Sequence, residues 1–324
     1  MKMHRYISAS LIGLAMLAAT PATAQDYPSK PVRFISPFSA GGSYTTLSRL
    51  IGQKLSEKWK QEFIIDPRPG GGGLIGTEPA ARAAPDGYTI VMFGNNQGIL
   101  PNIHTKAPFN VQKDFDPVIL VGTLPALVVV NPKLPVQSMA DLVKLVKQNP
   151  GKFNYGSGGN GSATHLATEM LKHATGMDIV HIPYKVSVDA TMDLIAGENQ
   201  VEVLDILSAR RYVEAGQIKP LSLTVNEKSP FFPNVPTIRE AGVENYEYTE
   251  WYGVFVPAGT PPAIIAKLNA GIAEVLSEPD VKKRLTEVFG VKPVLSSPED
   301  LRRFFDNEIK KNAEAVKLAK LKIE

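Results

Sequence analysis

The segment Val32–Ser43, VRFISPFSAGGS, combines an apolar run, a loop of glycine and serine, and the start of an amphipathic stretch. The apolar run predicts a strand over Val32–Phe38. Five apolar residues then recur at helical spacing, namely Leu47, Leu50, Ile51, Leu55 and Trp59. They predict a helix that begins at Ser43, with the serine side chain as its cap. A strand that leads through such a loop into a helix is the repeating unit of α/β folds.

The second half of the chain repeats this construction. The segment FNYGSGGNGS, residues 153–162, predicts a strand over Phe153–Tyr155 and a helix over Ser162–His173. Glycine lets a ligand approach the backbone, and the first N–H groups of a helix lack partners within the helix. Each loop is therefore a candidate anion cradle at the carboxyl end of a strand. The alternative is that both loops are tight turns with ordinary helix caps.

Short apolar runs and amphipathic stretches alternate over the rest of the chain, as is typical of an α/β fold with largely parallel sheets. Further strands are predicted over Phe63–Ile65, Tyr88–Phe93, Val118–Val121, Leu127–Val130, Ile179–Tyr184, Val201–Leu204, Pro220–Val225 and Trp251–Val256. Further helices are predicted up to Ala84 and over Met139–Lys147, Asp189–Ala196, Ser208–Ala215, Pro262–Leu276, Pro279–Phe289 and Pro298–Leu318. Residues 94–98 are expected to form a polar loop.

The first 24 residues have the pattern of a removable export signal. A basic start with Lys2 and Arg5 precedes the apolar stretch Ile7–Ala19, which is too short for a stable membrane anchor. The small residues Ala22 and Ala24 then provide a cleavage site, so the mature chain is expected to begin at Gln25. The alternative is a buried or amphipathic N-terminal helix.

Composition limits the kind of protein and its partners. About 300 mature residues are too many for a single core, so two domains are expected. Removing Lys2 and Arg5 from 35 basic residues leaves 33 against 32 acidic ones. This balance gives no reason to expect nucleic acid or an anionic membrane as a partner. The chain has no cysteine, which excludes thiol catalysis and zinc-thiolate sites.

Enzyme-like motifs are weak throughout. The glycines at 70–73 are not followed by the Lys and Ser/Thr of a phosphate loop, so they predict a flexible connection. Ser157 is not in a nucleophile elbow, and no base–nucleophile pair is evident. His165 and Glu169 share a helix face, but no third metal ligand is evident. We therefore expect no catalytic residue, no metal and no cofactor.

Charged residues after the strand Val201–Leu204 leave two interpretations open. Asp205 either points into a cleft between lobes or is a plain turn carboxylate. Arg210 and Arg211 either bring cationic charge to that cleft or lie on a solvated helix face.

In its loops the chain resembles the substrate-binding proteins of tripartite tricarboxylate transporters, the Bug-type periplasmic receptors. The matching residues run over nearly the whole mature chain: Tyr27–Pro31, Pro37-Phe38, Gly41-Gly42, Arg68–Gly70, Gly72-Gly73, Ile75-Gly76, Pro85–Thr89, Asp114-Phe115, Pro117-Val118, Ser157-Gly158, Gly161-Ser162, His165-Leu166, His181–Lys185, Pro233–Thr237 and Pro257–Pro261. Each match is weak alone, but their order and spacing are specific.

The resemblance implies a two-lobed type II periplasmic binding fold with a ligand cleft between the lobes. One lobe would hold residues 25–122 and 250–324 and the other residues 123–249, with crossings near Thr123–Ala126 and Tyr248–Tyr252. It implies a monomeric periplasmic receptor that captures a small carboxylate and delivers it to a membrane permease. Two other functions remain open: a periplasmic hydrolase or transferase on a two-lobed α/β fold, and a ligand-sensing receptor for a two-component system.

The loops and the resemblance together predict the ligand site. On the first lobe the expected residues are Ser39, Ala40, Gly41, Gly42, Ser43, Thr45, Asn95 and Asn96, and on the second Ser157, Gly158, Gly161, Ser162, Thr164 and Asp205. The chain departs from the family pattern at four places: Thr45 replaces an acid, Val186 a glycine and Asn312 a tryptophan, and the 205–211 loop is shorter. Since Thr45 and the 205–211 loop are expected to face the cleft, the loss of an acid would favour a dianion.

Overall fold

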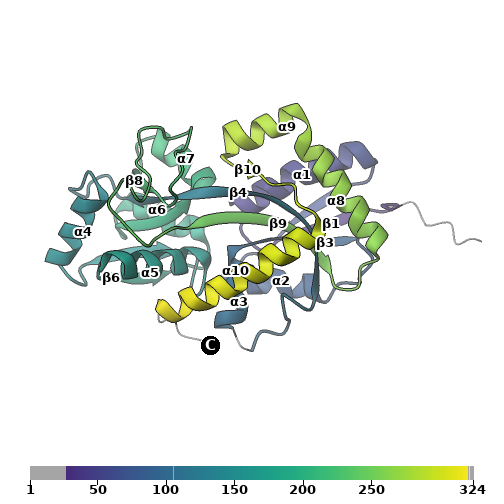
Figure 1. Ribbon diagram of the computed structural model, residues 1–324, viewed down its shortest axis with the longest axis horizontal. Coiled ribbons are helices and arrows are strands. Elements are labelled where there is room, and N and C mark those ends of the chain that lie inside the picture. Colours follow the sequence, from purple (N-terminus) through teal and green to yellow (C-terminus); the bar gives the residue numbers. More distant parts are fainter. Residues whose placement is uncertain (1–26, 105, 320, 322–324) are drawn as a thin grey trace, which may run out of the picture.

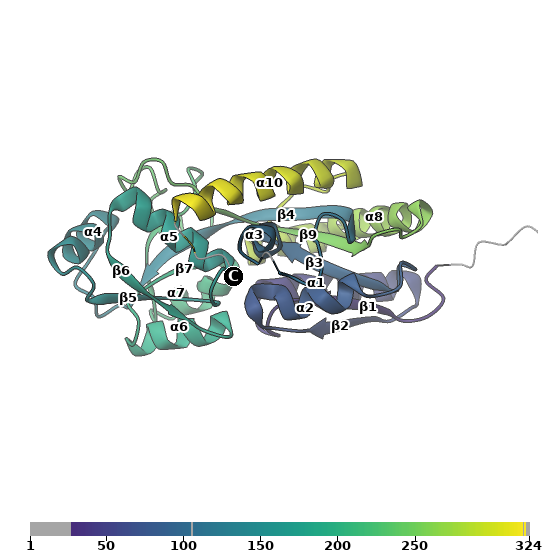
Figure 2. The ribbon, with the colours of Figure 1, turned by 90° about the horizontal axis from the view of Figure 1, so that it is seen from below.

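A computed structural model describes residues 27–104, 106–319 and 321. The predicted signal peptide, residues 1–24, lies outside the described residues. The chain forms an α/β structure in which a ten-stranded sheet runs through both halves of an elongated molecule (Figures 1 and 2). The expected α/β class is therefore confirmed. Within the described ranges, we find no helix that combines the length and the apolar character needed to cross a membrane.

The strand order in the sheet is β2-β1-β3-β9-β4-β7-β5-β6, and β8 and β10 also pair with β4. The strands are β1 (Val32–Ser36), β2 (Phe63–Pro67), β3 (Thr89–Gly94), β4 (Phe115–Val130), β5 (Phe153–Ser157), β6 (Ile179–Pro183), β7 (Val201–Asp205), β8 (Lys219–Leu223), β9 (Thr249–Pro257) and β10 (Lys292–Pro293). We call the half with β1, β2, β3, β9 and β10 lobe 1, and the half with β5–β8 lobe 2. Strand β4 belongs to both lobes.

The helices cover this sheet and connect its strands (Figures 1 and 2). They are α1 (Ser43–Trp59), η1 (Gly71–Gly73), α2 (Leu74–Ala81), α3 (Asn95–Ile103), α4 (Met139–Gln148), α5 (Ala163–Thr175), α6 (Ser187–Ala196), α7 (Ile206–Glu214), α8 (Pro262–Ser277), α9 (Pro279–Lys283), η2 (Arg284–Phe289) and α10 (Pro298–Leu318). The expected polar loop over residues 94–98 is wrong, because α3 begins there. The Gln97 side chain accepts a hydrogen bond from the Gly94 N–H at 3.1 Å and so starts the helix.

Strand β4 joins the two lobes without a break. The sequence predicts two strands around Pro125, whereas the structure has a single strand of 16 residues. Pro125 is opposite Thr249 of β9, and the next residue, Ala126, is opposite Asp205 of β7. Proline lacks an N–H donor, and it lies here where the ladder changes partner, so the strand continues through it.

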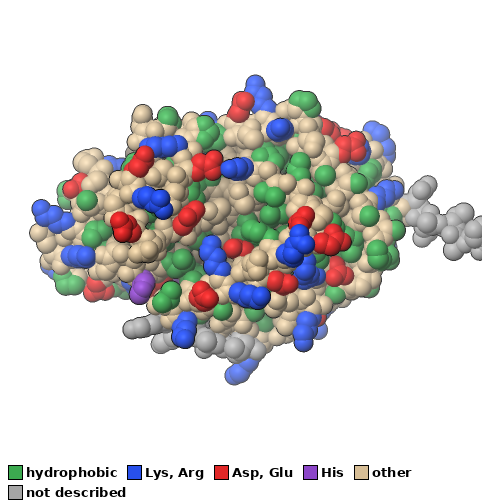
Figure 3. Space-filling view, viewed as in Figure 1, with side chains coloured by type: hydrophobic (Ala, Val, Ile, Leu, Met, Phe, Trp, Pro, Cys, Tyr) green, Lys and Arg blue, Asp and Glu red, His purple; other side chains and the backbone are tan. Residues whose placement is uncertain are grey.

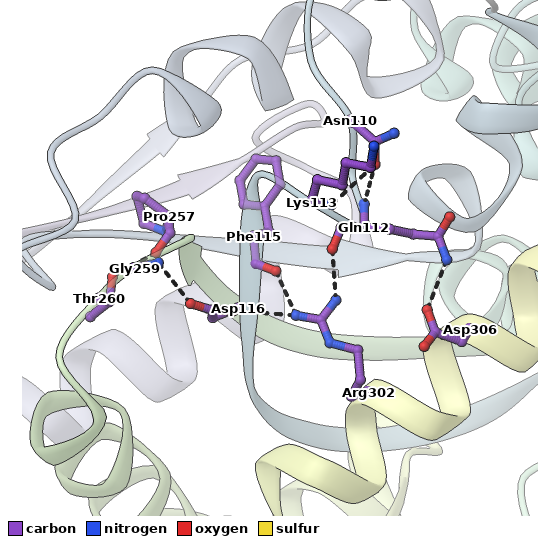
Figure 4. Close-up of polar contacts among 10 residues, drawn as sticks. All are labelled: Asn110, Gln112, Lys113, Phe115, Asp116, Pro257, Gly259, Thr260, Arg302 and Asp306. Carbon is purple, nitrogen blue, oxygen red and sulfur yellow. Dashed lines mark hydrogen bonds and ion pairs between the residues drawn. The ribbon is translucent and has the colours of Figure 1, made fainter.

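Helix α10 ties the lobes together along one side of the sheet (Figure 2). Near its start, Arg302 donates hydrogen bonds to the backbone oxygens of Phe115 at 2.7 Å and Gln112 at 3.1 Å (Figure 4). Near its end, Ala315 and Val316 join the apolar core of lobe 2. Asn312 of α10 is buried against Gly98 of α3.

Charged side chains of both signs are interspersed over the face of the molecule shown in Figure 3. This distribution agrees with the near-neutral mature charge.

Candidate ligand-binding site

A cavity lies between the two lobes and is lined by residues from both. Lobe 1 contributes Phe38, Ser39, Gly41, Gly42, Ser43, Tyr44, Pro69, Gly70, Gly72, Gly73, Asn96, Glu250 and Tyr252. Lobe 2 contributes Gly158, Ser162, Ala163, Thr164, Lys185, Val186, Ser187, Val188, Thr191, Leu204, Asp205, Ser208, Arg211 and Tyr212.

Five helices begin at the wall of this cavity. Residues at the N-termini of α1, α2, α5, α6 and α7 are among its lining residues: Ser43, Gly73, Ala163, Ser187 and Asp205. The first N–H groups of a helix lack partners within the helix, and the helix dipole adds partial positive charge there. The cations Lys185 and Arg211 also line the cavity. This arrangement favours an anionic ligand.

The structure brings most of the predicted site residues together. The predicted residues that line the cavity are Ser39, Gly41, Gly42, Ser43, Asn96, Gly158, Ser162, Thr164 and Asp205. Ala40, Thr45, Asn95, Ser157 and Gly161 are not among the lining residues. Ligand contact by the lining residues stays a prediction, whereas the placement of Thr45 and Asn95 at the cleft needs correction.

Thr45 lies behind the first loop and is fully buried. Its hydroxyl group is 2.7 Å from that of Ser36 and donates to the Ser39 carbonyl oxygen at 2.9 Å. Asn95 is held at the crossing strand: its amide donates to Thr249 O at 2.8 Å, and its oxygen accepts from the Trp251 N–H at 3.0 Å. Both side chains therefore support the site without facing it.

Ser43 connects the lobes instead of capping its helix. The residue at the cap position of α1 is Gly42, so the Ser43 hydroxyl group does not cap the helix and can bond to other residues. It donates to Asp205 Oδ1 of lobe 2 at 2.7 Å and lies 3.1 Å from Ser208 Oγ. Asp205 also caps α7, since Oδ1 accepts from the Ser208 N–H at 2.9 Å. The open question about Asp205 is therefore settled in favour of the cleft.

Asn96 forms a second bridge between the lobes. Its oxygen accepts from the N–H of Ala163, the first residue of α5, at 2.8 Å, and its amide donates to Tyr44 Oη at 3.1 Å. Ser162 caps the same helix by accepting from the His165 N–H. The second glycine-rich loop thus opens a capped helix, as its sequence predicts.

A serine–histidine pair does exist, contrary to the expectation from the sequence. Ser157 Oγ lies 2.6 Å from His181 Nε2, because the parallel strands β5 and β6 end side by side. The Ser157 side chain is fully buried, lies outside the cavity lining and also bonds Gly159. The His181 ring stacks on His165, and burial lowers the pKa of His181 to about 4. The pair is therefore part of the packing that holds the second loop.

His165 and Glu169 have partners within the protein. His165 Nδ1 accepts from the Gly161 N–H at 3.0 Å, and Glu169 pairs with Lys172 at 2.7 Å. Within the described residues, no group of histidine, cysteine and acidic side chains could hold a metal ion.

Sequence reasoning missed several lining residues. Gly71–Gly73 form the short helix η1, and Gly70, Gly72 and Gly73 line the cavity, whereas the sequence predicts only a flexible connection. Glu250 and Tyr252 are also missed, since they belong to an apolar strand of lobe 1 that comes late in the chain. Burial, with a smaller contribution from the nearby Asp205 carboxylate, raises the pKa of Glu250 to about 8. Only the three-dimensional pairing of β9 with β4 brings this acid to the cavity.

The two arginines of α7 have different positions. Arg211 lines the cavity, where its guanidinium group lies over the Tyr212 ring. Arg210 instead reaches lobe 1 and donates to the backbone oxygens of Glu287 and Val288, each at 3.1 Å. These carbonyl groups lie at the end of η2, where backbone oxygens lack partners within the helix. Arg211 is exposed and also borders the cavity, so both interpretations hold for it, whereas Arg210 contacts lobe 1 and is not a lining residue.

We predict that Arg210→Ala weakens lobe closure, because it removes two hydrogen bonds between α7 and η2. The ligand-free variant should have a larger radius of gyration than wild type in small-angle X-ray scattering. Arg82→Ala is the matched control, since Arg82, the C-cap residue of α2, is paired with Glu78 of the same lobe, as Arg210 is with Glu214. Equal radii for wild type and Arg210→Ala would show that this contact does not hold the lobes together.

The chain is similar in sequence and structure to a family of known proteins. The model of the tripartite tricarboxylate transporter family receptor, TctC, matches residues 47–321. The solved structure of R. palustris Rpa4515 with adipate is 34% identical, with a TM-score of 0.89, and the match covers 92% of this chain and 100% of that one. The periplasmic binding protein BugD is 27% identical with a TM-score of 0.86, over 92% of this chain and 100% of BugD. MatC from Rhodopseudomonas palustris with bound malate is 28% identical with a TM-score of 0.84, over 90% of this chain and 100% of MatC.

The family model matches most of both lobes, and the match to Rpa4515 covers 92% of the chain. The resemblance inferred from the loops is confirmed, and so is the two-lobed periplasmic binding fold. The chain belongs to the tripartite tricarboxylate transporter receptor family.

Proposed function

We propose that this protein is a periplasmic receptor that captures a small organic carboxylate between its lobes and delivers it to a tripartite tricarboxylate-type permease. The observation that carries the proposal is the convergence of five helix N-termini, Lys185 and Arg211 on one cavity. A desolvated carboxylate needs several donors, and helix N-termini provide them. The relatives with adipate and malate support a carboxylate ligand.

As a member of this receptor family, the protein is a binding protein rather than an enzyme. The proposed periplasmic location rests on the export pattern of the first 24 residues and on the periplasmic relative BugD. We further propose that the receptor acts as a monomer. Its lobes would comprise residues 25–122 with 250–324, and residues 123–249, with hinges where β4 and β9 pass between them.

The site proposal places one carboxylate of the ligand at the N-terminus of α1, near Ser39, Gly41 and Ser43. A second polar group of the ligand would meet Ser162 and Thr164 at the N-terminus of α5. Asp205 accepts a hydrogen bond from the Ser43 hydroxyl group, so the ligand would either replace this carboxylate or bind beside it.

We predict that Ser162→Ala and Ser43→Ala each weaken binding of the ligand by about 1–3 kcal/mol, through loss of one hydrogen bond to a charged group. Calorimetric titration with adipate and malate measures this change. Ser138→Ala is the matched control for Ser162→Ala, because Ser138 caps α4 in the same way but lies outside the cavity lining. Both cap variants should lose about 0.5–2 kcal/mol of stability, but only Ser162→Ala should lose affinity.

Two outcomes would contradict different parts of this proposal. Wild-type affinity in both Ser43→Ala and Ser162→Ala would disprove the two-loop cradle. A bound ligand stabilises the folded state and so raises the melting temperature. If no member of a panel of small carboxylates raises the melting temperature, the carboxylate-receptor function is disproved.

A further inference from the structure

Glu250 is a buried acid in the wall of the cavity. It is the second residue of β9, and its side chain is 5% exposed. Its Oε1 is bonded to the Tyr248 hydroxyl group at 2.5 Å. The other carboxyl oxygen, Oε2, is buried and has no hydrogen-bond partner among the described residues. A buried polar atom without a partner costs free energy, so this oxygen indicates a missing partner.

Glu250 is in none of the ion pairs found among the described residues. The titratable groups that face it are four tyrosines and one acid: Tyr246 and Tyr248 before β9, Tyr252 on β9, Tyr44 on α1 and Asp205 at the end of β7. Asp205 has the same sign as an ionised Glu250. Lys185 and Arg211, the cations of the cavity lining, belong to lobe 2 and form no ion pair with Glu250 in the described structure.

Burial without a counter-ion favours the neutral form of a carboxyl group. It raises the pKa of Glu250 to about 8, so the group is protonated at neutral pH. A protonated carboxyl group has one O–H donor, which an ionised one lacks. Glu250 can thus offer a hydrogen bond to an anion, although it is an acid.

Building on the carboxylate receptor proposed above, we propose that Glu250 binds the ligand as a neutral carboxyl group and donates a hydrogen bond to a carboxylate oxygen of the ligand. The proton stays on Glu250, and only the protonated receptor binds tightly. Ionisation of Glu250 would place two negative charges, those of Glu250 and Asp205, beside an anionic ligand.

The test measures the dissociation constants of adipate and malate by calorimetry from pH 6.5 to pH 9. Both acids are fully ionised above neutral pH, so the ligand itself adds no pH dependence there. If only the neutral form binds, the dissociation constant should rise about tenfold between pH 7 and pH 9. Titrations near pH 8 in buffers of different ionisation enthalpy should show proton uptake on binding.

Two variants separate this contact from general effects of pH. Glu250→Gln keeps a donor but cannot ionise, so its affinity should be independent of pH over the same range. Glu202→Gln is the matched control: burial also raises the pKa of Glu202 to about 8, but Glu202 is not a cavity-lining residue. Glu202→Gln should therefore keep the tenfold change seen in wild type.

A second measurement requires no ligand. In protein labelled with ¹³C at the glutamate carboxyl carbon, the signal that Glu250→Gln removes should titrate near pH 8. A midpoint near the ordinary glutamate value would overturn the proposal. Binding of either acid without pH dependence, or tighter binding above pH 8, would overturn it as well and leave the receptor function intact. If neither acid nor any other small carboxylate binds at any pH, the receptor function fails and this contact fails with it.

Discussion

Between pH 5 and pH 9, the unfolding free energy of wild-type protein should fall by on the order of 4 kcal/mol more than that of the Glu202→Gln variant. Glu202 is fully buried in β7, where the Thr191 hydroxyl group donates to Oε1 at 3.2 Å and Oε2 has no partner in the described structure. Burial raises the pKa of Glu202 from 4.5 in the unfolded chain to about 8 in the folded protein. The folded state therefore binds a proton that the unfolded state has released, and stability falls as pH rises through this interval.

Urea unfolding of wild type and Glu202→Gln at pH 5, 7 and 9 measures the effect. The difference between the two proteins isolates Glu202, because Glu250 titrates in both. Glu314→Gln, an exposed change on α10, controls for the charge removed and should leave the pH dependence of wild type unaltered. Parallel pH profiles for wild type and Glu202→Gln would show that Glu202 is ionised in the folded protein.

The second large effect is expected at Gly94, where alanine should destabilise the protein by about 3 kcal/mol. Gly94 has extended backbone angles, so the cost is steric rather than conformational. A methyl group there would overlap the Tyr44 hydroxyl group and would come within 2.7 Å of the Trp251 carbonyl oxygen. The backbone of Trp251 cannot yield without disturbing the β3–β9 pairing.

Gly41→Ala is the matched control, since an added methyl group at Gly41 meets no atom within 4 Å. Thermal unfolding should therefore distinguish the variants, with a much lower melting temperature for Gly94→Ala and little change for Gly41→Ala. Because Tyr44 lines the cavity, Gly94→Ala should also weaken ligand binding. A Gly94→Ala protein as stable as wild type would show that Tyr44 and β9 can move apart.

Local patterns in the sequence are sufficient to predict the two strand–loop–helix segments that line the cavity. The strands before Gly41 and Gly158 and the helices after them follow from apolar spacing and from glycine and serine at the helix starts. The errors arise where a local signal is ambiguous. Residues 94–98 contain two asparagines and two glycines, which are typical of loops, yet the Gln97 side chain starts a helix there.

The remaining features of the site depend on contacts between residues far apart in the chain. Ser43 and Asp205 are separated by 162 positions, and only the approach of the lobes shows that one binds the other. Glu250 lies in a strand whose apolar pattern predicts burial but not a cavity wall. Thr45 shows the opposite case: its place just after the first loop suggests the cleft, but in helix α1 its side chain contacts Ser36.

Strand β9 lies between β3 and β4 in the sheet, and all strands of lobe 2 precede it in the chain. The chain emerges from the ribosome N-terminus first, so all strands of lobe 2 emerge before β9 does. Until residue 257 has been made, β3 lacks its partner β9 and is an open sheet edge. Such an edge invites pairing with other chains. The strands of lobe 2 can therefore pair early, while the sheet of lobe 1 stays incomplete until β9 is made and is the part that needs protection during synthesis.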